Sequence, residues 1–100
     1  MEFDEFLKLC HQEQEPQHLD GTLVALWYES RGNWDQAHSI VQQMPGVDAA
    51  RVHAYLHRKE GDEGNASYWY ARAGSKKPQL SLQQEWQQIS RELLSKYATP

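Results

Sequence analysis

The sequence predicts an all-α protein, an array of two antiparallel α-hairpins with a capping helix on either side. A Gly-Asx turn with an alanine four residues after the Asx occurs twice, at Gly32-Asn33 and, 29 residues later, at Gly61-Asp62. A repeated helix–turn–helix unit is typical of stacked helical arrays. No segment shows the alternation of apolar and polar residues that a half-buried strand requires.

The bulk composition indicates one small soluble domain over residues 1–100. The mean hydropathy of −0.86 is low, but an aromatic fraction of 11% argues against disorder. With a net charge of −4 and scattered basic residues, the chain has no footprint for nucleic acid. We expect no signal peptide, and no apolar run reaches the roughly 20 residues that span a membrane. The single cysteine, Cys10, fits a reducing compartment, so we expect a cytoplasmic protein.

The N-terminal half predicts a capping helix and the first hairpin. Apolar residues at helical spacing place a helix over residues 2–13, within an N-terminal capping segment of residues 1–16. The first hairpin occupies residues 20–45. Its first helix begins at Asp20 or Thr22 and ends near Gly32, and Asn33 caps its second helix with Gln36 as capping-box partner. Pro45-Gly46 then stops the chain from continuing as helix.

The C-terminal half predicts the second hairpin, residues 47–74, and a C-terminal capping helix, residues 81–97. Asp48 is the expected cap of the fourth helix and Asp62 that of the fifth. Ser81, with Gln84 three residues later, has the pattern of a capping box at the start of the last helix. Gly32 and Gly61 are expected to adopt positive φ, because a tight turn between helices needs a residue that can do so without strain.

The two hairpins resemble tetratricopeptide and related Sel-like repeats. The second hairpin has the residues that such a repeat places at its turn glycine, small packing position, aromatic position, second alanine and closing proline. They are, in that order, Gly61-Asp62, Ala66, Tyr70, Ala73 and Pro78. The first hairpin keeps fewer of these residues, and the period of 29 is shorter than the usual 34 or so. The stretch from His53 to Gly74 is also similar to a set of small uncharacterised bacterial proteins. The repeat resemblance implies a surface for protein or peptide partners.

His53 and His57 are the first candidates for a functional site. They lie four residues apart, so they share one face of their helix with a spacing that suits two metal ligands. In the alignment of the hairpins they replace Val24 and Tyr28, which should face the partner helix. A third ligand could come from the first hairpin, at His38, Asp35 or Glu29. The alternative is that each imidazole is a hydrogen-bonded residue of a partly polar core.

Aromatic and basic residues of the second hairpin are the other candidates. Tyr68, Trp69 and Tyr70 are consecutive, so they spread over about 200° of the helix surface and cannot all face one core. Arg58 and Arg72 could stack on an exposed ring. The functional interpretation is an aromatic and basic groove for a peptide or small anion, and the structural one is a core rich in aromatic residues.

Two functional hypotheses follow. The first is a small interaction module that binds a protein or peptide, or forms a homodimer, and needs no cofactor. Its candidate binding residues are Tyr28, His38, His53, His57, Arg58, Tyr68, Trp69 and Arg72. The alternative is a small-molecule or metal-binding protein, or an enzyme, centred on His38, His53 and His57. The chain has no His-Glu-x-x-His, nucleophile-elbow or phosphate-loop motif, so no catalytic residue is assigned.

Overall fold

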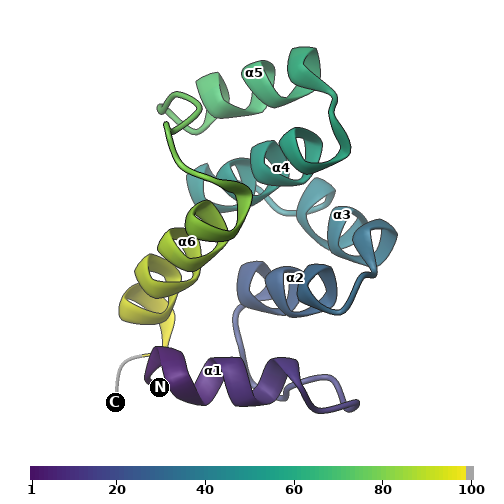
Figure 1. Cartoon of the computed structure of the whole chain (residues 1–100), viewed down its shortest axis with the longest axis vertical. Helices are drawn as coiled ribbons and strands as arrows, with labels where there is room; N and C mark the ends of the chain where they lie inside the picture. Colours follow the sequence, from purple (N-terminus) through teal and green to yellow (C-terminus); the bar gives the residue numbers. More distant parts are fainter. Residues whose placement is uncertain (99–100) are drawn as a thin grey trace.

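The computed structural model describes residues 1–98, and the described chain is helical with no strand, which confirms the all-α prediction (Figure 1). No helix in this part of the chain is both long and apolar enough to cross a bilayer. The helices are α1 (Phe3–Cys10), α2 (Gly21–Ser30), α3 (Trp34–Gln42), α4 (Val47–Glu60), α5 (Glu63–Arg72) and α6 (Leu82–Tyr97).

The first five helices follow one another along the molecule, and each packs against the next (Figure 1). The sixth helix runs back along this row and packs against α1, α2 and α4. It returns the chain to its starting point, where the Met1 ammonium group donates a hydrogen bond to the Ala98 carbonyl. The row places α3 directly against α4, which is the contact that matters for the candidate site.

Local side-chain caps begin four of the helices, as the sequence predicts. The carboxylate of Asp20 accepts from the Thr22 amide at 3.0 Å, and that of Asp62 from the Asn65 amide at 3.1 Å. The side chain of Asn33 accepts from the amide of its expected partner Gln36 at 3.1 Å. At α6, Ser81 and Gln84 form the complete capping box. These bonds satisfy amides that have no partner within the helix.

The prediction that Asp48 caps the fourth helix is wrong. Helix α4 already begins at Val47, after Gly46 with a φ of +100°, and Asp48 lies within its first turn. Its carboxylate binds the C-terminal end of α6, accepting from Lys96 Nζ at 2.7 Å and from the Tyr97 hydroxyl. The first helix is also shorter than the predicted residues 2–13, since it ends at Cys10 before a polar stretch.

A main hydrophobic core joins α1, α2, α3, α4 and α6, and a smaller one lies between α4 and α5. Four alanines of the two hairpins, Ala25, Ala37, Ala54 and Ala66, are all buried. Gly32 and Gly61 have φ angles of +83° and +88°, so both turns use the left-handed conformation that glycine adopts without strain. The small buried alanines and the two glycine turns together favour the consecutive packing of α2 to α5.

Candidate metal centre

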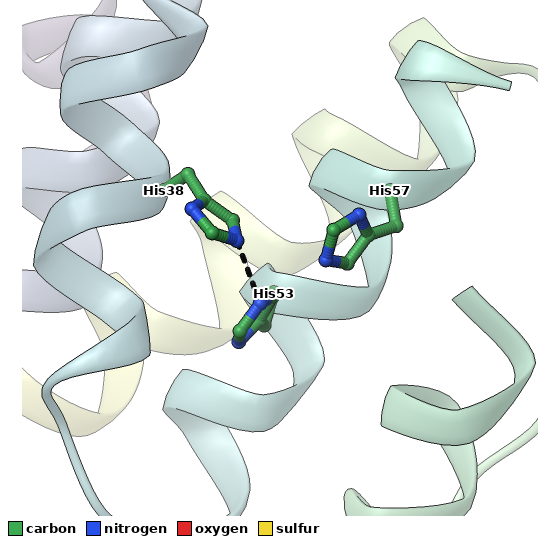
Figure 2. A group of neighbouring side chains, drawn as sticks. All are labelled: His38, His53 and His57. Carbon is green, nitrogen blue, oxygen red and sulfur yellow. Dashed lines mark hydrogen bonds between the residues drawn. The ribbon is translucent and has the colours of Figure 1, made fainter. Parts of the chain in front are cut away.

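Three histidines from two helices meet where α3 packs against α4. His53 and His57 project from the same face of α4, and His38 projects from α3 toward them (Figure 2). The Nε2 atoms of His38 and His53 are 3.0 Å apart. One ring nitrogen from each of the three residues lies within 4.8 Å of the other two. We call His38, His53 and His57 the histidine cluster.

Two tryptophans hold the cluster from opposite sides. Trp34, one turn before His38 on α3, stacks on its imidazole with ring centroids 4.8 Å apart and planes 9° apart. The indole N–H of Trp34 donates to the Leu56 carbonyl of α4 at 2.8 Å, which ties the two helices together beside the cluster. From α5, Trp69 stacks on His53 at 4.0 Å. The imidazoles are therefore held by packing as well as by their helices.

Burial keeps the imidazoles of His38 and His53 neutral near pH 7. His53 and His57 are 4% and 7% exposed, and His38 is half-buried. Burial, followed by the proximity of His38 and His57, lowers the pKa of His53 to about 4. The pKa of His38 is lowered by burial and then by His57, against the opposite effect of Glu60 and Asp35. Neutral imidazoles carry the free lone pair that a metal ion needs.

The contact between His38 and His53 requires a proton on one of the two Nε2 atoms. The other ring nitrogen of His53, Nδ1, is buried and has no hydrogen-bond partner in the described part of the chain. A proton on His53 Nε2 leaves a bare lone pair at Nδ1, which costs less than a buried unpaired N–H. A buried polar atom without a partner is rare in proteins and often marks a functional site.

Glu60 orients the third imidazole. Its Oε2 lies 2.6 Å from Nδ1 of His57, so the carboxylate accepts the Nδ1 proton, and in the neutral form of this imidazole the lone pair is on Nε2. Figure 2 shows the far edge of this ring directed toward the other two histidines. A carboxylate on the outer nitrogen is the usual companion of a metal-ligating histidine, because it fixes both tautomer and orientation.

The other proposed third ligands lie elsewhere. Glu29 is 4% exposed and forms an ion pair with Lys59, and Asp35 is exposed and does not belong to the cluster. Of the alternatives that the spacing left open, only His38 is brought to His53 and His57.

The remaining candidate binding residues divide between surface and interior. On α5, the Arg72 guanidinium lies 5.5 Å from the Trp69 ring and 5.8 Å from that of Tyr68, which is 52% exposed. Tyr28 packs against Trp27, with ring centroids 4.9 Å apart. Arg58 is turned inward: it donates to Glu85 at 2.7 Å and to the Leu80 carbonyl at 2.6 Å. Arg58 is therefore part of an internal ion pair rather than of an exposed groove.

Sequence reasoning missed three residues that shape these sites. Glu85 is fully buried and accepts from both Arg58 and the Tyr70 hydroxyl, the latter at 2.6 Å. Trp34 stacks on His38, a contact that was not predicted from the sequence. Glu60 lies three residues after His57, a spacing that puts both on one helix face and could have identified it.

Comparisons with models of protein families, with curated proteins and with solved structures found no match. Function must therefore be argued from the geometry. Three imidazoles suit Zn²⁺, Cu²⁺ and Ni²⁺ rather than Mg²⁺ or Ca²⁺, which prefer oxygen ligands. Nitrogen ligands of a tetrahedral zinc ion lie about 3.3 Å apart, given Zn–N bonds of about 2.0–2.1 Å. The His38 to His53 separation of 3.0 Å is close to that value, and the other ring nitrogens lie within 4.8 Å.

Proposed function

We propose that this protein binds one transition-metal ion, of the Zn²⁺ class, through a ring nitrogen of each of His38, His53 and His57. The observation that carries the proposal is the convergence of three ring nitrogens from two helices within 4.8 Å. Two histidines four residues apart on one helix are common in proteins. A third from another helix, directed at the same point, supplies the multidentate geometry that a metal ion requires.

The surroundings of the cluster support this proposal. Trp34 and Trp69 restrict two of the rings, and Glu60 fixes the tautomer of the third. Binding therefore costs little rearrangement beyond closing the ring nitrogens onto the ion. A second group of possible ligands, His57 with Glu60 and Asp62, is a weaker candidate. Asp62 already caps α5, and both carboxylates lie toward solvent.

Calorimetric titration of the metal-free protein with Zn²⁺ tests the proposal. We expect one equivalent to bind with micromolar or tighter affinity, and His38→Gln to weaken binding at least tenfold. His38 is the most exposed ligand, so this variant is the least prone to unfold, and circular dichroism verifies its helices. His11→Ala, which removes an exposed histidine outside the cluster, is the matched control and should bind as the parent does. Equal zinc affinity in His38→Gln and the parent would refute the proposal.

A second candidate function is the interaction module, favoured by the exposed side chains at the edge of α4 and α5. Val47 and Tyr68 are 58% and 52% exposed. A groove of about 380 Å³ beside them is lined by Gln42, Met44, Pro45, Gly46, Val47, Ala50, Trp69 and Arg72. Aromatic residues and arginine are enriched where protein interfaces gain most of their affinity. We propose a protein or peptide partner for this face, with a second copy of the chain as the first to test.

A tetratricopeptide-like array would explain why such a face exists. In this proposal α2 with α3 and α4 with α5 are its two hairpins, each joined by a Gly-Asx turn and packed along its length. A short array leaves end surfaces that a second copy can cover. Light scattering over a concentration series measures the oligomeric state. A dimer that Tyr68→Ala and Arg72→Ala together dissociate would support this candidate, and a monomer at all concentrations would exclude the homodimer.

A further inference from the structure

The histidine cluster provides three metal ligands and no fourth. In the described part of the chain, the group of donor atoms that share a centre consists of the three imidazoles alone. Glu60 is engaged with Nδ1 of His57 and does not belong to that group. Zn²⁺ and Co²⁺ in nitrogen-ligand sites are usually four-coordinate. A metal ion held by these residues lacks one ligand from the protein.

The cluster approaches the surface at one of its three histidines. His53 and His57 are nearly inaccessible to solvent, whereas His38, on α3, is half-buried. The stacked rings of Trp34 and Trp69 occupy the flanks of His38 and His53. A ligand that reaches the ion is therefore expected to be small and to enter from the side of His38.

The charge of the site selects the kind of ligand. All three protein ligands are neutral imidazoles, so a divalent ion retains its full charge of about +2 at the centre. The Arg72 guanidinium, 5.5 Å from the Trp69 ring, adds positive charge on one side, while Glu60 and Asp35 lie on the side of His57 and His38. The ion itself dominates this balance because it is the largest local charge. Small monoanions should compete well with water there.

We infer that the metal ion bound by His38, His53 and His57 keeps one exchangeable position, which takes a water molecule or a small monoanion. This inference rests on the proposed metal-binding function. The exchange replaces one bound water by one anion, with no change in the ion's oxidation state and no loss of a histidine ligand. An exchangeable position separates metal sites that can activate a water molecule from purely structural ones, which are closed by four protein ligands.

Co²⁺-loaded protein titrated with azide provides the test, because the visible spectrum of Co²⁺ reports its coordination. We expect the Co²⁺ bands to change saturably with azide, and the infrared stretch of azide to shift on binding. The contact-shifted imidazole N–H signals in the proton NMR spectrum count the histidine ligands. All should persist when azide binds. His11→Ala should respond as the parent does.

The outcomes separate this inference from the proposal beneath it. Failure of Co²⁺ and Zn²⁺ to bind overturns both. If Co²⁺ binds but its spectrum does not respond to azide, the site is closed, and the inference fails while the metal site remains. Loss of an imidazole signal on azide addition means that the anion displaced a histidine. That result also overturns the inference, because no position was vacant.

Discussion

Two buried polar side chains differ in how completely their hydrogen-bonding groups are satisfied. Glu85 is fully buried, yet Arg58 donates to one of its oxygens and Tyr70 to the other. His53 keeps one buried ring nitrogen with no partner in the described chain. A satisfied carboxylate between helices has a structural role. His53 has no such complete network, since only its Nε2 is engaged, by His38.

Glu85→Gln should be among the most destabilising conservative substitutions in this protein. The amide leaves the Arg58 guanidinium, whose side chain is only 14% exposed, without a counter-charge. We expect the free energy of unfolding to fall by about 3 kcal/mol, as for other broken buried pairs. Urea denaturation measures it. In the matched control Glu92→Gln the exposed pair with Arg51 is lost, and the cost should stay below about 1 kcal/mol. Equal losses in the two variants would contradict the structural role of Glu85.

At the residue scale, the sequence placed His53 and His57 together and offered His38 as one of three possible third ligands, but it did not predict the partners of Arg58. Helical spacing places His53 and His57 on one face, and the aligned hairpins indicate that this face meets the other hairpin. Arg58 has its partner 27 residues away, on α6. A local pattern holds no information about such a contact, so its assignment to an exposed surface was wrong.

Among the elements, the contact between α3 and α4 determines whether the cluster can assemble. Trp34 makes two interactions at this contact. It stacks on His38, and its indole N–H donates to the carbonyl of Leu56, one residue before His57. A tryptophan at this position therefore sets both the separation of the two helices and the direction of one ligand. The element-scale consequence is that metal affinity should depend on a residue that does not touch the ion.

Trp34→Phe tests this dependence, since phenylalanine keeps an aromatic ring but has no N–H to donate. The lost hydrogen bond should cost about 1 kcal/mol in the free energy of unfolding. Zinc affinity should fall about tenfold, the usual lower bound for a residue that supports a ligand. Calorimetry and urea denaturation of the same samples give both values. Zinc affinity equal to the parent's would show that Trp34 only packs.

Helix caps show which parts of an element a sequence can predict. Asp20, Asn33, Asp62 and Ser81 bind amides two or three residues away, so their roles follow from local order. Asp48 looked equally suitable but binds Lys96 and Tyr97 on α6. Local rules gave the wrong role there because a tertiary contact outweighs the cap.

For the whole molecule, periodicity and turns were enough to predict an all-α chain and the approximate extent of each helix. The packing of α6 across α1, α2 and α4 was not predictable, because an amphipathic stripe specifies which face is buried but not against which helices. Folding also brings three basic side chains into a shared, largely buried space. This has a cost that depends on pH.

Without metal, the protein should lose stability as the pH falls below about 6.5. The pKa of His53 drops from 6.5 to about 4 on folding, so the unfolded chain takes up a proton more readily. The contribution of His53 to the free energy of unfolding is fully present above pH 6.5 and is lost as the pH falls toward 4. With allowance for solvent screening we expect a loss of about 1 kcal/mol between about pH 7 and about pH 5.

Urea denaturation in the presence of a chelator measures this dependence. The control His53→Gln keeps a polar side chain of similar length and cannot titrate. Its stability should change less over the same pH range, whatever its absolute value. A parent and a variant that decline in parallel would show that His53 does not contribute to the acid sensitivity.

The central claim is that the histidine cluster holds a metal ion. Anomalous diffraction from crystals of the zinc-loaded protein, collected on either side of the zinc absorption edge, tests it most directly. The account predicts one strong peak between α3 and α4, about 2.0–2.1 Å from a ring nitrogen of each of His38, His53 and His57. A peak at Glu60 and Asp62 instead, or no ordered peak in a zinc-saturated crystal, would contradict it.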